Sequence, residues 1–374
     1  MKSFSELPLS ALLKSNLSKH GFEQPTPIQE LAIEPALAGR DVVATAQTGT
    51  GKTLAFVLPI IHRLTEQPGQ AGIRAVILSP TRELAIQISE AFAKMAAGSG
   101  IRAAVAVGGL SERVQLQAIR KGAQVLIATP GRLMDFLGRN LVNLSQVRTL
   151  VLDEADRMLD MGFLPTVTKI MAAMPSDRQT LLFSATIQTS VKHLVKTHVR
   201  DAVRVEAGDT TQPIAKIELH LYEVEQDCKL GLLENMLRRE QGSFLVFART
   251  KHGADKLSVK LARQGVKTAV IHGNRSQSQR NHALRGFQEG DYRVLVATDV
   301  AARGIHVEGI SHVVNYDLPQ VPEDFIHRVG RTGRAGASGT ASTFATRSER
   351  SQIAQIERKL DSKLTRRALL QSTN

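Results

Sequence analysis

The chain alternates short apolar runs rich in Val and Ile with longer stretches whose apolar residues recur at helical spacing. A run that is apolar on both faces indicates a strand covered on both sides, and alternation of such strands with helices indicates a parallel, doubly wound sheet. Ligand sites in such sheets lie at the carboxyl ends of the strands. In the first half of the chain, strands are predicted at 41–45, 74–79, 103–107, 124–128, 149–152 and 180–183.

The pattern breaks near Glu206 and restarts after a polar, turn-rich segment, 207–215, which is typical of a linker. We therefore predict the α/β fold class, with two tandem domains at 1–206 and 216–374 that are each a mostly parallel, doubly wound sheet. The basic end of the chain, 359–374, is predicted to begin as a helix and then fray. In the second domain, strands are predicted at 244–247, 268–271, 294–297, 312–316 and 340–344.

Composition and charge narrow the function. A length of 374 residues suits two domains of common size. The net charge of +13 predicts a polyanionic partner, with a merely basic soluble enzyme as the alternative. Aromatic residues make up 4% and Trp is absent, which favours phosphate contacts over rows of stacked bases. The single cysteine, Cys228, suits a reducing cytoplasm, and the lack of a long apolar run or a signal-peptide pattern predicts no membrane span.

The segment 46–53 follows a predicted strand and precedes an apolar helical run, which is the context of a phosphate-binding P-loop. Lys52 is expected to reach the β- and γ-phosphates of ATP, and the Thr53 hydroxyl to ligate Mg²⁺. Ala46 stands where the general pattern has Gly, and a Gly-rich turn without a ligand is the alternative. The predicted nucleotide loop comprises Gln47, Thr48, Gly49, Thr50, Gly51, Lys52 and Thr53.

The strand at 149–152 delivers two carboxylates to the same sheet edge. Asp153 is expected to hold Mg²⁺, usually through water, and Glu154 to orient the attacking water and accept its proton. The alternative is that Asp153 or Asp156 caps the following helix. The P-loop upstream in the same domain favours the metal and base roles.

Upstream of the P-loop, the segment 21–29 allows two interpretations that are compatible with each other. Thr26 as N-cap, Pro27 at the first helical position and Gln29 three residues on form a capping box. Alternatively, the Gln29 amide pairs with an adenine edge while Phe22 stacks on the ring. Spacing alone favours the capping box.

In the second domain, Arg328, Arg331 and Arg334 recur every three residues and are predicted to line one face of a helix or turn. Arginine suits bidentate phosphate recognition, so arginine fingers are one hypothesis and a solvated basic surface is the other. The segment 184–186, Ser-Ala-Thr, follows a strand and could relay between nucleotide and nucleic acid. On its own it is better explained as a helix cap.

Several strand ends in both domains combine a small polar residue, a Pro or Gly, and a basic residue. Each alone is typical of a cap or turn, but together on a basic chain they predict phosphate contacts that do not read bases. The predicted nucleic-acid contacts are Pro80, Thr81, Arg82, Gly109, Thr129, Arg132, Thr250, Gly273, Gln277, Arg280, Thr298 and Asp299.

Taken together, the motifs GFEQPTPIQ, AQTGTGKT, PTRELA, TPGR, DEAD, SAT, ATDVAARG and HRVGRTGR resemble those of the DEAD-box family of RNA helicases, in order from about Phe4 to Phe344. The bacterial RhlE-like subgroup is the most similar. The resemblance implies two RecA-like domains that close on ATP, Mg²⁺ and RNA, bending the bound strand and unwinding short duplexes locally without sequence specificity.

The resemblance also implies residue roles. Gln29 and Phe22 would select adenine, which reverses the preference from spacing, and Gly304 would contact the nucleotide. His306 stands where the family usually has an Asp at the ribose, which predicts weaker or pH-sensitive nucleotide binding. The implied catalytic residues are Lys52, Asp153, Glu154, Arg331 and Arg334, and the implied coupling residues are Ser184, Thr186, Asp156 and His327.

Two alternatives share these residues: an ATP-gated RNA clamp that hardly unwinds, and a DNA helicase of the same superfamily. The family further implies a monomer in the cytoplasm that works with RNA-decay or ribosome-assembly proteins. We expect no accessory RNA-binding domain after the second domain, so target choice would come from protein partners or from none, with a truncated natural tail as the alternative.

Overall fold

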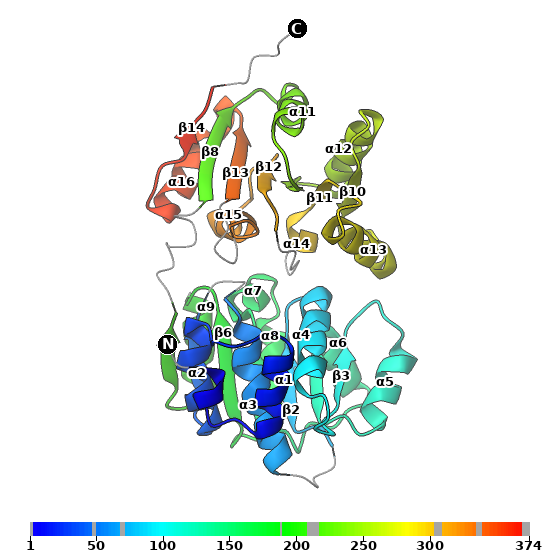
Figure 1. The fold of residues 1–374 in the computed structure, drawn as a ribbon, viewed down its shortest axis with the longest axis vertical. Helices are drawn as coiled ribbons and strands as arrows, with labels where there is room; N and C mark the ends of the chain where they lie inside the picture. The colour runs from blue at the N-terminus through cyan, green and yellow to red at the C-terminus, as the bar shows by residue number, and fades with distance from the viewer. Residues whose placement is uncertain are drawn as a thin grey trace. The chain divides into compact units, whose positions relative to one another are not determined.

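The computed structural model describes residues 3–46, 50–67, 72–187, 189–207, 217–302, 309–333 and 339–368 (Figure 1). The chain divides into two compact units, 1–208 and 209–374. Nearly all of the segment predicted as a linker lies outside the described residues. Its first residue, Ala207, is described and donates its backbone N–H to the carbonyl of Thr45 at 3.1 Å.

The first unit is built on a seven-stranded parallel sheet in the order β3-β4-β2-β5-β6-β1-β7. The strands are β1 (Val42–Thr45), β2 (Ala75–Leu78), β3 (Ala103–Ala106), β4 (Val125–Ala128), β5 (Thr149–Leu152), β6 (Gln179–Ser184) and β7 (Val203–Glu206). The helices are η1 (Phe4–Glu6), α1 (Ala11–Lys19), α2 (Pro27–Leu37), α3 (Lys52–Glu66), α4 (Arg82–Met95), α5 (Glu112–Arg120), α6 (Pro130–Gly138), α7 (Ala155–Asp160), α8 (Leu164–Ala172) and α9 (Thr189–His198).

The second unit repeats this plan with a seven-stranded parallel sheet in the order β10-β11-β9-β12-β13-β8-β14. Its strands are β8 (Ile217–Glu223), β9 (Phe244–Phe247), β10 (Thr268–Ile271), β11 (Val294–Ala297), β12 (His312–Asn315), β13 (Gly339–Ala345) and β14 (Thr365–Arg366). Its helices are α11 (Lys229–Arg239), α12 (Lys251–Arg263), α13 (Gln277–Gln288), α14 (Asp299–Ala302), α15 (Pro322–Val329), η3 (Arg347–Glu349) and α16 (Arg350–Leu360).

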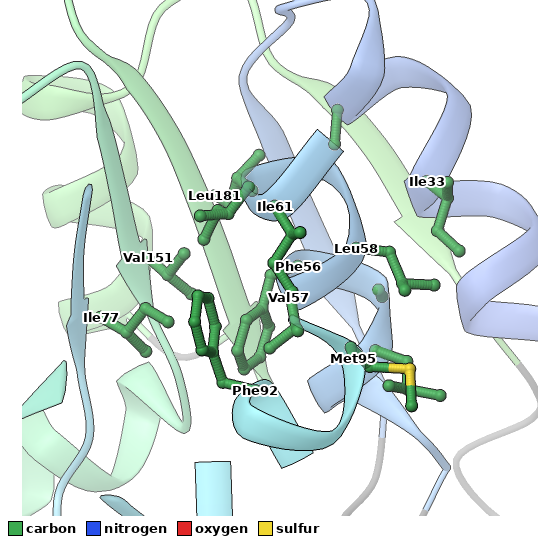
Figure 2. Close-up of a cluster of buried hydrophobic side chains, with 14 of the residues drawn as sticks. Ile33, Phe56, Val57, Leu58, Ile61, Ile77, Phe92, Met95, Val151 and Leu181 are labelled. Carbon is green, nitrogen blue, oxygen red and sulfur yellow. The ribbon is translucent and has the colours of Figure 1, made fainter. Parts of the chain in front are cut away.

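Alternate strand residues of the first sheet pack into two different cores, which confirms that helices cover both faces. In β1, Val42 and Ala44 join one core and Val43 joins the other. Figure 2 shows the first core, in which Phe56 of α3 and Phe92 of α4 pack against the sheet residues Ile77, Val151 and Leu181. Burying each large apolar side chain contributes about 1.5–3 kcal/mol. Helix α3 is therefore fixed on the sheet, and with it Lys52 at its first turn.

Three observed strands were not predicted. β7 and the short β14 lie at sheet edges, and β8 alternates apolar with polar residues, so none of them is a continuous apolar run. The end of the chain differs from the prediction for the same reason: α16 ends at Leu360, and the predicted fray contains β14, which pairs with β8. Within the described ranges, no helix combines the length and apolarity that a bilayer crossing requires.

Candidate nucleotide and nucleic-acid site

All strands of the first sheet are parallel, so their carboxyl ends share one edge. Along this edge, the P-loop follows β1, the segment 184–186 ends β6, and Asp153 follows β5. Those predicted nucleic-acid contacts that belong to the first unit follow β2, β4 and β3. Because the strand order is β3-β4-β2-β5-β6-β1, the candidate phosphate contacts for nucleic acid and the candidate nucleotide site occupy adjoining halves of one edge.

The last residues of the P-loop are tightly packed. Gly51 has φ +86° and caps the start of α3, and a Cβ at this position would lie 2.5 Å from the Gln29 side-chain nitrogen. The buried Lys52 donates from Nζ to the carbonyl of Ala46 at 2.9 Å. Ala46 is not among the described residues with positive φ, so alanine is tolerated where the general pattern has glycine. Gln47, Thr48 and Gly49 lie outside the described residues.

The segment 21–29 is hydrogen-bonded to the P-loop. The Gln29 Oε1 accepts from the backbone N–H of Thr26 at 2.8 Å, the capping interaction, while Gln29 Nε2 donates to the carbonyl of Gly51 at 2.8 Å. The Thr26 hydroxyl donates to the carbonyl of Thr50 at 2.7 Å. The side chain of Phe22 is 40% exposed, which leaves its ring accessible for stacking. The capping role of the Gln29 amide is therefore observed, and its contact with adenine stays a prediction.

The two carboxylates after β5 are both buried. Burial raises the pKa of Asp153 to about 7, although the charge of Lys52 opposes this shift, and Glu154 adds to it. A cation nearby would favour the ionised form of Asp153. Glu154 has φ +48° and forms an ion pair with Arg157 at 2.5 Å. Arg157 was not among the predicted site residues, although its position three residues after Glu154 on a helix is the spacing of such pairs.

The oxygen donors here suit Mg²⁺. Among the described residues, no three His, Cys, Asp or Glu side chains converge as a metal cage. Mg²⁺ instead takes one or two carboxylates together with substrate phosphates and water. Asp153 and Thr53, near the start of α3, offer this kind of partial set.

The segment 184–186 is bonded directly to the carboxylate motif. Asp156 Oδ2 accepts from the backbone N–H of Ala185 at 3.0 Å, and from the N–H and hydroxyl of Thr186 at 2.8 and 3.1 Å. The Ser184 hydroxyl accepts from the N–H of Asp156 at 3.2 Å and donates to the carbonyl of Thr186 at 2.7 Å. This network joins the ends of β5 and β6, which a simple helix cap would not do.

In the half of this edge where nucleic-acid contacts are predicted, Arg82 packs over Gly109, which has φ +78°; a Cβ at Gly109 would overlap the guanidinium. Thr81 caps α4, accepting from the N–H of Leu84 at 3.3 Å, and the buried Pro80 precedes it. Close packing therefore fixes this part of the edge.

The neighbouring strand end carries Thr129, the N-cap residue of α6, and Arg132 in the first turn of that helix. Arg132 is paired with Glu112 at 3.1 Å, and Glu112 also binds Arg139 at 2.7 Å. The Arg132 guanidinium, which is predicted to contact a nucleic-acid phosphate, is therefore held in place by Glu112.

The second sheet also collects predicted contacts at its carboxyl edge. Thr250 follows β9 and caps α12, accepting from the N–H of Gly253 at 3.0 Å. Gly273 follows β10, and the buried Thr298 follows β11. These three strands are neighbours in the sheet. At the start of α13, Gln277 Nε2 donates to Asn281 at 2.9 Å, and Arg280 donates to the carbonyl of Ala301 at 3.4 Å.

Two of the three arginines predicted on one face, Arg328 and Arg331, are described, and their surroundings differ. Arg328 is 2% exposed, binds both carboxylate oxygens of Asp299 at 2.6 and 2.7 Å, and lies 4.9 Å from the ring of Phe247. It is therefore a buried structural arginine, and it occupies the Asp299 carboxylate that was predicted to contact nucleic acid. This pair was not predicted from the sequence, because its two residues come from α14 and α15.

Arg331 lies elsewhere in the second unit. Its Nε donates to the carbonyl of His327 at 3.1 Å, and its side chain lines a pocket with Ser311 and Thr340. These residues lie at the amino-terminal ends of β12 and β13, opposite the edge that carries Thr250. The second unit thus keeps Arg331 apart from its predicted nucleic-acid contacts. Arg334, Gly304 and His306 lie outside the described residues.

Both units are similar to known proteins. Two family models match the chain, one described as DEAD/DEAH box helicase over residues 26–194 and one as helicase conserved C-terminal domain over residues 228–336. The chain is 41% identical over 333 residues to ATP-dependent RNA helicase CshA of Listeria monocytogenes, covering 88% of this chain and 63% of that protein. It is 42% identical over 335 residues to ATP-dependent RNA helicase vasa of Drosophila melanogaster, covering 88% and 51%.

The chain thus spans about half to two thirds of the length of these curated relatives. Among solved structures, it is similar to S. cerevisiae Dbp5 bound to RNA and ADP BeF3, with a TM-score of 0.88 and 33% identity, covering 99% of this chain and 96% of that chain. The predicted fold class, two tandem RecA-like domains, is confirmed.

Proposed function

Because this chain belongs to the DEAD-box family of helicases, we propose that it is an ATP-dependent RNA helicase. Its two domains close on ATP and RNA, which stimulates ATP hydrolysis, and this closure unwinds short RNA duplexes locally, without reading sequence. The observation that carries this proposal is the shared edge of the first sheet, where candidate phosphate contacts for RNA adjoin the candidate nucleotide site. The bonds from Asp156 to Ala185 and Thr186 support a connection between ATP and RNA along that edge.

In the first domain, the amide groups at the start of α3 and the amine of Lys52 bind the ATP phosphates. Glu154, held by Arg157, accepts the proton of the attacking water. Thr53 and Asp153 would hold Mg²⁺, which when bound supplies positive charge beside the phosphates. Gln29 and Phe22 select adenine, as the resemblance implies.

The second domain contributes Arg331 and Arg334 as arginine fingers that stabilise negative charge on the transferred phosphate. Such a finger accelerates phosphoryl transfer by about 10³- to 10⁵-fold, so hydrolysis depends on closure of the two domains. RNA promotes closure by binding the strand ends of both domains through its sugar-phosphate backbone. The membership in an RhlE-like subgroup, the cytoplasmic location and the partners in RNA decay or ribosome assembly remain parts of this proposal.

The proposal is tested by ATP hydrolysis with and without single-stranded RNA at low and moderate salt. We expect strong stimulation by RNA, little by DNA of the same sequence, and loss of about 10² or more in rate for Glu154→Gln, which removes the base. Stimulation by DNA but not RNA would show a DNA helicase. Strong stimulation without strand separation would show an RNA clamp. Equal hydrolysis with and without RNA would contradict the proposal.

A further inference from the structure

The two sheets have the same strand order, so their positions can be compared one by one: β1 corresponds to β8, β2 to β9, β5 to β12 and β6 to β13. The helix after β1 begins with Lys52, and the helix after β8 begins with Lys229. Asp153 donates its backbone N–H to the last residue of β2 at 3.0 Å, and Asp317 donates to the last residue of β9 at 3.1 Å. Lys229 and Asp317 therefore lie at places similar to those of Lys52 and Asp153, although Asp153 is the first residue after β5 and Asp317 is the second after β12.

The second domain surrounds its lysine with its own carboxylates, which lie at ion-pair distance, although Nζ has no hydrogen-bond partner among the described residues. Lys229 is 0% exposed, and its Nζ lies 3.6 Å from Asp317 Oδ1 and 4.0 Å from Glu349 Oε2. Lys52 instead donates to the carbonyl of Ala46, and its charge acts on Asp153 without a contact of ion-pair length in the described part of the chain. Where the first domain offers an amine to a nucleotide, the second domain neutralises the equivalent amine with its own carboxylates.

The same two carboxylates hold Arg249. Asp317 Oδ2 accepts from the backbone N–H of Arg249 at 2.9 Å, and Glu349 Oε1 accepts from its guanidinium at 2.8 Å. Burial alone raises the pKa of Glu349, but hydrogen bonds from Thr346 and the charge of Lys229 together hold that pKa below its ordinary value. Glu349 therefore stays ionised as a bridge between Lys229 and Arg249.

Simple stabilisation does not explain this cluster well. Burying Lys229 and partly burying Asp317 and Glu349 carries a desolvation penalty that their attraction often fails to exceed, so such an ion pair is weak support for stability. The contacts of Asp317 and Glu349 instead converge on Arg249. Arg249 directly precedes Thr250, the cap of α12. The cluster fixes the backbone where a predicted RNA contact begins.

We propose that Lys229, Asp317 and Glu349 form a ligand-independent counterpart of the nucleotide site, which positions the segment Arg249–Thr250 for contact with the RNA backbone. The inference rests on the proposed function for its RNA partner. The three residues are positioning residues, since they act through Arg249 and Thr250.

Hydrogen–deuterium exchange of the two-domain chain without RNA tests the positioning directly. Asp317→Ala removes the acceptor for the Arg249 N–H, so exchange over residues 249–251 should rise by about tenfold, whereas Asp317→Asn keeps an acceptor oxygen and should stay near the wild-type rate. Glu223→Gln is the matched control, because it breaks an ion pair with Arg350 in the same domain without touching Arg249. Unchanged exchange in Asp317→Ala would overturn the proposal.

The concentration of a uridine decanucleotide that half-maximally stimulates ATP hydrolysis tests the consequence. Asp317→Ala should raise it by about fivefold with the rate at saturating RNA retained, and Asp317→Asn should restore it. If Asp317→Ala does not fold because it strands the buried Lys229, the double variant Lys229→Met/Asp317→Ala removes that charge and carries the same test. The positioning role would be contradicted if Asp317→Ala had the same half-maximal RNA concentration as the wild type. It would also be contradicted if Asp317→Asn raised that concentration as much as Asp317→Ala does.

The two proposals fail separately. If RNA does not stimulate the wild type, the proposed function is wrong, while the exchange measurement still decides whether the cluster positions residues 249–251. If RNA stimulates the wild type, and Asp317→Ala needs no more RNA than the wild type for half-maximal stimulation, only the positioning role is wrong.

Discussion

At the scale of single residues, several side chains of the candidate site serve two neighbours at once. The Gln29 amide closes a capping box on Thr26 and also binds the carbonyl of Gly51 in the P-loop. A residue with two such bonds affects stability and nucleotide binding together. The two interpretations of Gln29 that the sequence left open can therefore be separated only by comparing nucleotides.

We predict that Gln29→Ala lowers the free energy of unfolding by about 1 kcal/mol and raises KM for ATP more than KM for GTP. The first effect follows from loss of the cap, and the second from loss of the adenine contact. Thermal unfolding and steady-state kinetics with both nucleotides measure them. The matched control is Gln279→Ala, which removes a capping box on Ser276 in the second domain. If the ATP preference survives in Gln29→Ala, Gln29 only caps.

A second prediction concerns Arg157, which pairs with Glu154 inside the protein. Arg157→Lys keeps the charge but loses the planar guanidinium, so Glu154 is held less well and kcat should fall by about tenfold, with KM for ATP nearly unchanged. Arg148→Lys, which alters an exposed pair with Asp177, is the control and should hydrolyse ATP like the wild type. A wild-type kcat in Arg157→Lys would show that the pair is purely structural.

At the scale of elements, the strand ends connect the carboxylate motif to the segment after β6 through Asp156 and Thr186. Thr186→Val removes the hydroxyl bond to Asp156 but keeps the shape of the side chain. We predict that strand separation falls by about tenfold while RNA-stimulated ATP hydrolysis falls by no more than about twofold. Unwinding and ATPase assays on the same preparation measure this. Equal losses in both assays would show that the bond does not couple them.

Sequence pattern predicted the strands that are buried on both faces, because these read as continuous apolar runs. It missed β7, β8 and β14, whose polar positions face outward at or beside sheet edges. Within the candidate site, residues adjacent in one motif were predicted together. The bonds from Asp156 to Thr186 and from Arg328 to Asp299 were not, because they depend on which strands become neighbours.

At the scale of the whole molecule, the charge of +13 is spread over a chain with few aromatic residues, so phosphate contacts should dominate RNA binding. If roughly five phosphates are neutralised, the affinity for single-stranded RNA should fall by about 10²-fold between ~50 and ~200 mM salt. Fluorescence anisotropy with labelled oligouridine and oligoadenine measures the slope. Slopes that differ between the two sequences, or no salt dependence, would contradict backbone-led binding.

The position of β1 and β8 has a consequence for synthesis on the ribosome. Each is the first strand of its unit, yet each lies between two of the last strands that the unit supplies: β1 between β6 and β7, and β8 between β13 and β14. Neither sheet can be completed until its last strands have emerged, because these contacts are distant in sequence. Each unit must therefore be translated over nearly its entire length before its sheet is complete. The first unit can reach this point while the second is still being translated.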